Sequence, residues 1–261
     1  CYIDEQIVIF EGLGWLTMIK EDLRTLIDAG AGKIPADLVI RGGRLVNVFS
    51  AEIYPADVAV YRSRIVATGD VSEYLGVKTR IIGAEGKFLV PGLIDGHLHI
   101  ECSKLSMTSF ARAVLPHGTT SIVSGLDQYL VVAGLEGVKE ILAEIDRTPL
   151  KVFWGLPFLT PYTLPPSTVG FNVNAAVHEE VQKWPEVYGV WETINEFVEN
   201  HHPDVIRAIE LAGENRLPVF GCAAMTRGNK LNSVMCSGIR VDHESYDHEE
   251  MMEKIRKGLY V

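Results

Sequence analysis

Two histidines separated by one residue, His97 and His99, are the side chains whose spacing first suggests chemistry. They lie in the segment "PGLIDGHLHI", in which an apolar run ends at a glycine. Side chains on a strand alternate between its two faces, so residues at this spacing point to the same side. A pair of imidazoles placed in this way suits a metal such as zinc, iron or manganese. The alternative is that both are polar residues at the end of a strand.

Alternating strand and helix patterns surround this pair. From about residue 89 onward, six strand-like segments are each followed by a helix-like segment. The strand-like segments are "FLVPGLIDGH", "TTSIVSG", "LKVFWGLPFL", "VYGVWET", "LPVFGCAA" and "IRVDHE". Repeated strand–helix units predict a parallel sheet, and we expect an α/β fold of the (β/α) TIM-like barrel type, with about six units in this chain. A doubly wound open sheet is the alternative.

The carboxyl ends of these strands carry the candidate functional side chains, because barrel active sites lie at that end. Four of the six ends offer a metal-binding side chain: His97 with His99, Glu192, Cys222, and His243 with Glu244. A lone histidine at a strand end is more often structural, but nitrogen, oxygen and sulfur donors at four ends favour a metal site. Histidines within helix-like segments, such as His178, are expected to be solvated.

The residues before the barrel have a different pattern. Residues 36–70 combine β-branched residues with Gly-Gly, Asn and Ser-Ala turns, which predicts a small antiparallel β unit. A helix pattern begins at Met18. We expect an extension over residues 1–17, a helix plus β module over 18–88, and an incomplete barrel catalytic domain over 89–261. A native strand over "QIVIF" is the alternative for the first part.

Composition limits the possible partners and location. The 261 residues carry a formal net charge of −10 and contain no block of five like charges. We therefore expect no nucleic-acid partner, since such binding usually needs a basic surface. Four widely spaced cysteines without a CxxC pair are typical of reduced thiols in a cytoplasmic protein. No apolar run approaches the roughly 18 residues of a membrane span, so no membrane association is expected.

Three segments resemble the amidohydrolase superfamily and, within it, the adenine deaminases. They are "PADLVIRGGRLVNVFS", "VPGLIDGHLHIECSKLS" and "SGIRVDHESYDHEE". The pattern Pro-Gly-hydrophobic-Asp-x-His-x-His is a signature of the superfamily, and "DHES" narrows the resemblance to adenine deaminase-like proteins. The resemblance covers about residues 19–261. It implies a metal-dependent hydrolase barrel with a small N-terminal β-sandwich module.

The resemblance also implies roles for the residues at the strand ends. His97 and His99 would bind the more buried metal, and Glu192 would bridge two metals. His243 would be a ligand from the sixth strand. Cys222 stands where the family has a histidine, and its thiolate would ligate zinc or iron. The implied cofactor is one or two divalent transition metal ions, either zinc, manganese or iron.

Two further parts of the family pattern are not matched. The segment "GLDQ", Gly125 to Gln128, stands where the family has Asp-Pro-His-Glu. The last two barrel strands of the family, of which the eighth supplies an aspartate base, also have no counterpart. Because an incomplete barrel exposes strand edges, we expect a second chain that supplies the remaining strands, or a homo-oligomer. The alternative is that the sequence is a fragment of a longer chain.

The function implied by the resemblance is metal-dependent hydrolysis of a C–N bond in a small cyclic nitrogenous substrate. The expected reaction converts adenine and water to hypoxanthine and ammonia. Glu192 and Glu244 are the predicted catalytic carboxylates, and Glu244 would carry a proton. Two alternatives stay open. One is a cyclic amide or ureide amidohydrolase subunit completed by a second chain, and the other is a non-catalytic scaffold or regulatory subunit.

Overall fold

The computed structural model describes residues 2–3, 7–10, 23–160, 162 and 170–261. The chain divides into two compact units. Unit 1 comprises Cys1–Leu93 and Arg112–Thr120, and unit 2 comprises Ile94–Ala111 and Ser121–Val261. The helix predicted from Met18 lies partly outside the described residues, and its described part is α2 (Leu23–Gly30).

Unit 1 contains two β-sheets. The first has the order β1-β2-β9-β4-β5, formed by β1 (Tyr2–Ile3), β2 (Ile7–Phe10), β9 (Phe88–Pro91), β4 (Arg44–Asn47) and β5 (Glu52–Pro55). The second has the order β7-β6-β3-β8, formed by β7 (Arg64–Gly69), β6 (Asp57–Tyr61), β3 (Leu38–Arg41) and β8 (Arg80–Gly83). The short helices η1 (Ser72–Tyr74) and η3 (Leu115–His117) also belong to this unit. The strand considered over "QIVIF" is present as β2, which pairs in parallel with β9.

A shared hydrophobic core joins the two sheets of unit 1. Leu89 of the first sheet is buried in one cluster with Ile40 and Val58 of the second sheet. Val39 and Ala59 alternate with those residues along β3 and β6, and they pack in another cluster on the opposite face. Two sheets that bury side chains against each other form a sandwich. The predicted β-sandwich module is therefore confirmed.

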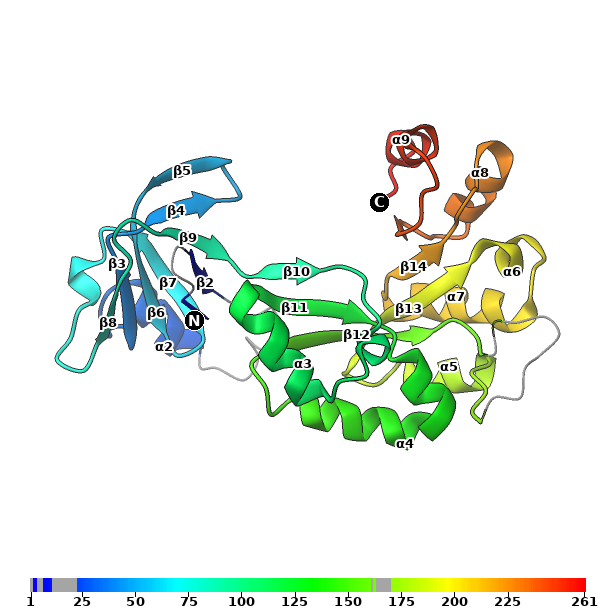
Figure 1. The fold of residues 1–261 in the computed structure, drawn as a ribbon, viewed down its shortest axis with the longest axis horizontal. Coiled ribbons are helices and arrows are strands. Elements are labelled where there is room, and N and C mark those ends of the chain that lie inside the picture. Colours follow the sequence, from blue (N-terminus) through cyan, green and yellow to red (C-terminus); the bar gives the residue numbers. More distant parts are fainter. Residues whose placement is uncertain (1, 4–6, 11–22, 161, 163–169) are drawn as a thin grey trace. The chain divides into compact units, whose positions relative to one another are not determined.

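The predicted (β/α) barrel is confirmed, and this chain forms a part of such a barrel. A sheet with the order β10-β11-β12-β13-β14-β15 runs in sequence order through unit 2 (Figure 1). Strands β11 to β15 pair in parallel. The strands are β10 (Leu93–Asp95), β11 (Thr119–Ser124), β12 (Lys151–Pro157), β13 (Val187–Ile194), β14 (Val219–Cys222) and β15 (Val241–Asp242).

A helix follows each strand of this sheet, as the sequence predicts. The helices are α3 (Met107–Val114), α4 (Asp127–Ile145), α5 (Ala175–Val181), α7 (Pro203–Asn215), α8 (Gly228–Cys236) and α9 (His248–Arg256), with a short additional α6 (Asn195–Glu199) before α7 and η2 (Ile100–Ser103) after β10. Val190 and Val219 on β13 and β14 share a buried core with side chains of α6, α7 and α8. These helices therefore pack against one face of the sheet.

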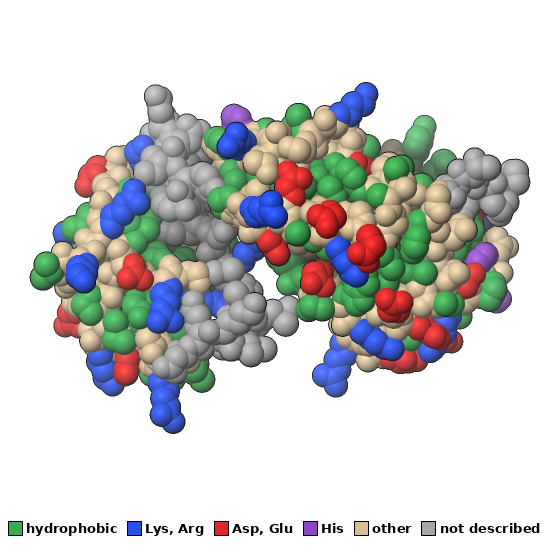
Figure 2. Space-filling view, turned by 90° about the horizontal axis from the view of Figure 1, so that it is seen from below, with side chains coloured by type: hydrophobic (Ala, Val, Ile, Leu, Met, Phe, Trp, Pro, Cys, Tyr) green, Lys and Arg blue, Asp and Glu red, His purple; other side chains and the backbone are tan. Residues whose placement is uncertain are grey.

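One face of the molecule carries charges of both signs. Lys and Arg side chains are interspersed with Asp and Glu side chains on the face seen in Figure 2. No helix within the described ranges is long and apolar enough to cross a membrane.

The prediction that His178 is solvated is wrong. Its side chain on α5 is fully buried, at 0% exposed. The Nε2–H group donates to the Phe158 carbonyl at 3.0 Å, and Nδ1 accepts from Gln182 at 3.0 Å. Burial lowers the pKa of His178 to about 4. The imidazole is therefore a neutral core residue, which sequence periodicity did not reveal because both of its nitrogens find partners inside the fold.

Candidate metal centre

His97 and His99 follow the end of β10, and their rings converge on one point. The Asp95 carboxylate accepts a hydrogen bond from the His97 backbone N–H at 3.2 Å. The Leu98 N–H donates to the Val123 carbonyl at 3.0 Å, which ties the segment to β11. The two imidazole Nε2 atoms lie 3.3 Å apart. The predicted pairing of these histidines is therefore present in the geometry, just beyond the strand rather than on it.

Glu192 reaches the same point from β13. Its Oε1 atom lies 3.2 Å from Nε2 of His97 and 3.0 Å from Nε2 of His99. The backbone of Glu192 is in the left-handed region, with φ of 49°. At the same place, the register between β13 and β14 shifts between Val190 and Thr193. Irregularities of this kind re-aim side chains next to functional sites, and this one directs the carboxylate toward the histidine pair.

His243 approaches from beyond β15. Its Nε2 atom lies 3.6 Å from Oε1 of Glu192, and its ring stacks on the His97 ring with centroids 3.6 Å apart. The Nδ1–H group donates to the Gly221 carbonyl at 3.0 Å. This bond fixes the tautomer and leaves Nε2 with a free lone pair. The ligand atoms of His97, Glu192 and His243 all lie within 4.8 Å of one another.

Cys222 and Glu244 form a neighbouring group with His243. Cys222 is the last residue of β14, and its thiol donates to Oε2 of Glu244 at 3.6 Å. The other Glu244 oxygen lies 4.0 Å from Nε2 of His243. Burial, followed by the nearby Glu244 and Glu192 carboxylates, raises the pKa of Cys222 to about 12. The structure thus places all six predicted side chains in one region, with His243 shared by two groups.

Asp127 belongs to the same region but was not predicted. Its side chain is buried, at 2% exposed for the residue, and Oδ2 lies 3.0 Å from Nδ1 of His99. Asp127 is the first residue of α4 and follows Leu126, which has a left-handed backbone with φ of 55°. Together with His99 and Glu192 it forms a third group of ligand atoms. One signal in the sequence could have identified Asp127. It is an acidic residue three positions after Ser124, close to the end of a predicted strand.

Trp191 packs beneath the histidines. Its indole stacks on the His97 ring with centroids 4.3 Å apart and an angle of 16° between the planes. A methyl group on Gly125 would lie 2.2 Å from Cδ1 of this indole. The glycine directly after β11 therefore leaves room for Trp191. The His97 ring is held between Trp191 and His243, which limits its orientations.

The Glu192 carboxylate is ionised and lies among the imidazoles of the site. Burial raises the pKa of Glu192, but hydrogen bonds from His97 and His99 outweigh this effect and lower the pKa to about 2. The contact with Asp127, followed by the hydrogen bond with Glu192, raises the pKa of His99 to about 10. An ionised carboxylate surrounded by imidazoles is a donor set that suits zinc, iron or manganese. The residues present therefore fit a divalent metal.

Comparison with known proteins shows sequence similarity to curated adenine deaminases. The chain is 59% identical over 242 residues to adenine deaminase 1 of Desulfotalea psychrophila. This alignment covers 93% of the chain and 41% of that protein. The chain thus spans about two fifths of the length of the curated relatives that it matches. No family model matches the sequence.

Solved structures give the fold relationship. An N-acyl-D-glutamate deacylase from Bordetella bronchiseptica, complexed with zinc and a phosphonate inhibitor, is similar with a TM-score of 0.54 and 17% identity. The match covers 87% of this chain and 57% of that one. A D-aminoacylase, described as defining a subset of amidohydrolases, has a TM-score of 0.53 and 16% identity, with coverage of 81% and 52%. At these identities the likeness concerns the fold alone.

Proposed function

Because this chain is adenine deaminase-like in sequence and has the amidohydrolase fold, we propose that it forms the metal-binding part of a C–N hydrolase. The proposed substrate is adenine. Water adds to the ring carbon that bears the amino group, the C–N bond breaks, and hypoxanthine and ammonia result. The observation that carries this proposal is the convergence of three imidazole Nε2 atoms on one Glu192 oxygen, all within 3.6 Å.

The proposed cofactor is one or two divalent ions of zinc, manganese or iron. His97, Glu192 and His243 would hold one ion, with His99 facing the same Glu192 oxygen. Cys222 and His243, which lie together with Glu244, offer donors for a second ion. When bound, such a metal supplies a Lewis acid and lowers the pKa of water to near 7.

The two predicted catalytic carboxylates suit different tasks. Glu192, with a pKa of about 2, stays ionised and is better suited to holding a cation than to carrying a proton. The Glu244 side chain is about half exposed, at 48%, and lies 4.0 Å from Nε2 of His243. It can therefore reach both solvent and the site. We assign to Glu244 the transfer of a proton from the attacking water to the leaving nitrogen.

The proposed partner supplies further barrel strands. Tyr260 forms a parallel bridge with Val241 of β15, so the chain at this point runs beside the last strand of the sheet. The Tyr260 N–H donates to the Arg240 carbonyl at 2.9 Å. In a barrel of parallel strands, a seventh strand would lie at the position of Tyr260, beside β15. A second chain, a second copy or further residues of a longer chain would continue the sheet, and native mass spectrometry of the purified protein would detect a second chain or copy.

A cyclic amide or ureide is the second candidate substrate. It is favoured by Cys222 and by the "GLDQ" segment, which depart from the adenine deaminase pattern at two strand ends. Both substrate classes need the same hydrolytic chemistry, because water attacks a ring carbon bonded to nitrogen. They differ in the bond that breaks: adenine loses an exocyclic amine, whereas a cyclic amide is opened.

The test is a product assay on the full chain loaded with zinc or manganese. Adenine should give equal amounts of hypoxanthine and ammonia, and hydantoin serves as the cyclic ureide for comparison. Glu244→Gln should lower the rate by roughly 10²–10⁴-fold, since it removes a general acid–base group. Glu249→Gln, at an exposed residue on α9, is the matched control. Unchanged activity in Glu244→Gln would contradict its role, and turnover of neither substrate would leave the scaffold alternative.

A further inference from the structure

Lys254 on α9 is a charged residue with no solvent exposure. Its side chain is 0% exposed, although lysine is almost never fully buried unless it is paired. Two carboxylates pair with it: Glu250 Oε1 at 2.6 Å and Asp242 Oδ2 at 2.7 Å. These carboxylates are buried as well. The residue lies outside the set of side chains proposed to hold the metal.

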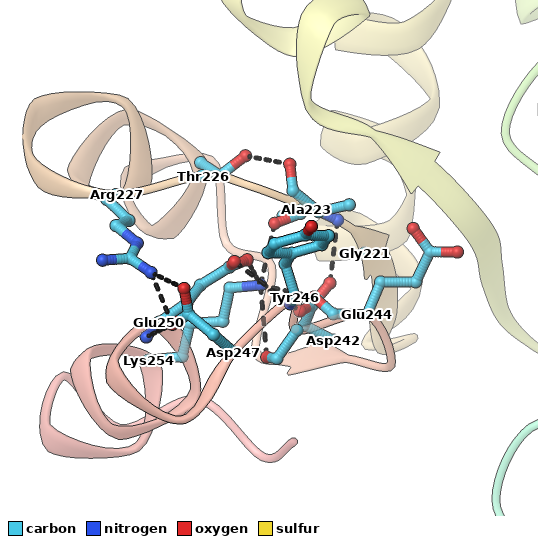
Figure 3. A network of polar contacts seen from close by, with 12 residues as sticks. Gly221, Ala223, Thr226, Arg227, Asp242, Glu244, Tyr246, Asp247, Glu250 and Lys254 are labelled. Atoms are coloured by element: carbon cyan, nitrogen blue, oxygen red, sulfur yellow. Dashed lines mark hydrogen bonds and ion pairs between the residues drawn. The ribbon is translucent and has the colours of Figure 1, made fainter.

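The Lys254 ammonium also binds backbone carbonyls at two strand ends. It donates to the carbonyl of Ala223 at 2.8 Å and to the carbonyl of Glu244 at 2.5 Å (Figure 3). Ala223 directly follows β14, and Glu244 lies two residues beyond β15. An ammonium has only three N–H donors, so these carbonyls share it with the two carboxylates.

Asp242 completes the connection between the two strand ends. Its Oδ1 atom accepts from the Ala223 N–H at 2.8 Å, while Oδ2 binds Lys254. The backbone N–H and the backbone carbonyl of Ala223 are therefore both fixed. Asp242 binds the N–H, and Lys254 binds the carbonyl. Cys222 directly precedes Ala223, and His243 lies between Asp242 and Glu244. Each anchored residue is a chain neighbour of a candidate ligand.

We propose that Lys254 is a positioning residue for the candidate metal centre. It sets the relative placement of the ends of β14 and β15, and thereby brings Cys222 and His243 to one point. This inference rests on the proposed function only in assigning a metal to that point. Lys254 touches neither metal nor substrate and acts through Asp242 and the two carbonyls.

The first test compares metal affinity in the full chain. Lys254→Met should weaken zinc binding by roughly 10–100-fold, the loss found when groups that orient metal ligands are removed. Binding is measured by competition with a chromogenic chelator. Lys257→Met is the matched control, because Lys257 directly follows the same helix and pairs with Glu253 at a partly exposed site. The control should bind zinc as the unaltered chain does.

A second variant separates positioning from folding. Lys254→Met alone leaves the Asp242 and Glu250 charges buried without a positive charge to balance them, which is destabilising. The triple variant K254M/D242N/E250Q removes all three charges, and the amide oxygen that D242N introduces can still accept from the Ala223 N–H. Since uncharged replacements of buried ion pairs are often tolerated, its thermal midpoint should be close to that of the unaltered chain. Its zinc affinity should remain roughly 10–100-fold weaker.

The third test measures the metal-free chain, so its result does not depend on the proposed function. The alkylation rate of Cys222 is followed by peptide mass spectrometry in the metal-free chain. It should rise in both Lys254 variants, while the exposed Cys236 on α8 reacts at an unchanged rate. If the triple variant shows unaltered zinc affinity and an unaltered Cys222 rate, the inference is overturned. If the unaltered chain binds no zinc but the Cys222 rate rises, the positioning role stands and the metal assignment fails.

Discussion

Nδ1 of His99 lies 3.0 Å from Oδ2 of Asp127, and Nε2 of the same ring lies 3.0 Å from Oε1 of Glu192. The imidazole thus lies between a carboxylate at the start of α4 and a carboxylate on β13. A carboxylate on the far nitrogen of a metal-binding histidine fixes its tautomer and ring orientation. This relationship gives Asp127 a defined task in the candidate centre.

Asp127→Asn is predicted to weaken the binding of divalent metal by roughly 10–100-fold, because it removes the charge that orients His99 but keeps the volume. Affinity is measured by competition with a chelator. Asp146→Asn, at an exposed position just after α4, is the control and should bind metal normally. Equal affinity in the two variants would show that Asp127 has no orienting effect.

Gly125→Ala is predicted to destabilise the fold and to disturb His97. The added methyl group would lie 2.2 Å from Trp191 Cδ1 and 2.7 Å from Asp127 Oδ1, so the indole must shift. Such overpacking costs about 1–3 kcal/mol in the free energy of unfolding.

The matched control for this change is Gly213→Ala on α7. A methyl group there meets no atom within 4 Å among the described residues. It should stabilise the helix by up to about 1 kcal/mol. Urea unfolding measures both variants. A Gly125→Ala protein as stable as the unaltered chain would contradict the role of Gly125 in making room for Trp191.

Cys222→His is predicted to change the metal preference. A thiolate is a softer ligand than imidazole and favours zinc over manganese, so the substitution should lower the ratio of zinc to manganese affinity. Competition between the two ions, followed by elemental analysis of the protein, measures this ratio. Cys236→His on α8 lies outside the three groups of ligand atoms and should leave the ratio unchanged. A ratio that stays constant in Cys222→His would place Cys222 outside the metal coordination.

His178 is predicted to make the fold sensitive to acid. Its pKa falls from 6.5 to about 4 on burial, so between these values the unfolded chain binds a proton that the folded chain does not. The free energy of unfolding should therefore decrease as pH falls from 6.5 toward 4, by about 3 kcal/mol for this shift.

The test of this pH dependence is urea unfolding at neutral and mildly acidic pH. His178→Gln retains a donor for the Phe158 carbonyl but does not titrate, so its stability should depend less on pH than that of the unaltered chain. His201→Gln, at an exposed residue, should keep the full dependence. Identical pH dependence in all three proteins would contradict the assignment.

The sequence predicted the meeting of the strand-end side chains because parallel strands bring their carboxyl ends to one edge of a sheet. His97, Glu192 and His243 lie together for that reason. The alternating pattern predicted a parallel sheet, and the sequential order of its strands is the one expected of a barrel rather than of a doubly wound sheet. These features depend on chain direction and periodicity, which a single sequence contains.

Other features depend on contacts that periodicity does not encode. Asp127 is buried against His99 because the left-handed turn at Leu126 directs α4 into the site. Glu192 points at the histidines because of a local break in the register of β13. Lys254 is an ordinary helix residue in the sequence, and only the tertiary structure shows that it joins two strand ends.

The most direct test of the candidate metal centre is the number of metal ions bound per chain. The full chain is loaded with zinc, freed of excess ion and examined by elemental analysis beside Glu192→Gln, with Glu196→Gln on α6 as the control. At least one tightly bound ion is expected in the unaltered chain and in the control, and its loss is expected in Glu192→Gln. Absence of bound metal in the unaltered chain, or equal binding in Glu192→Gln, would contradict it.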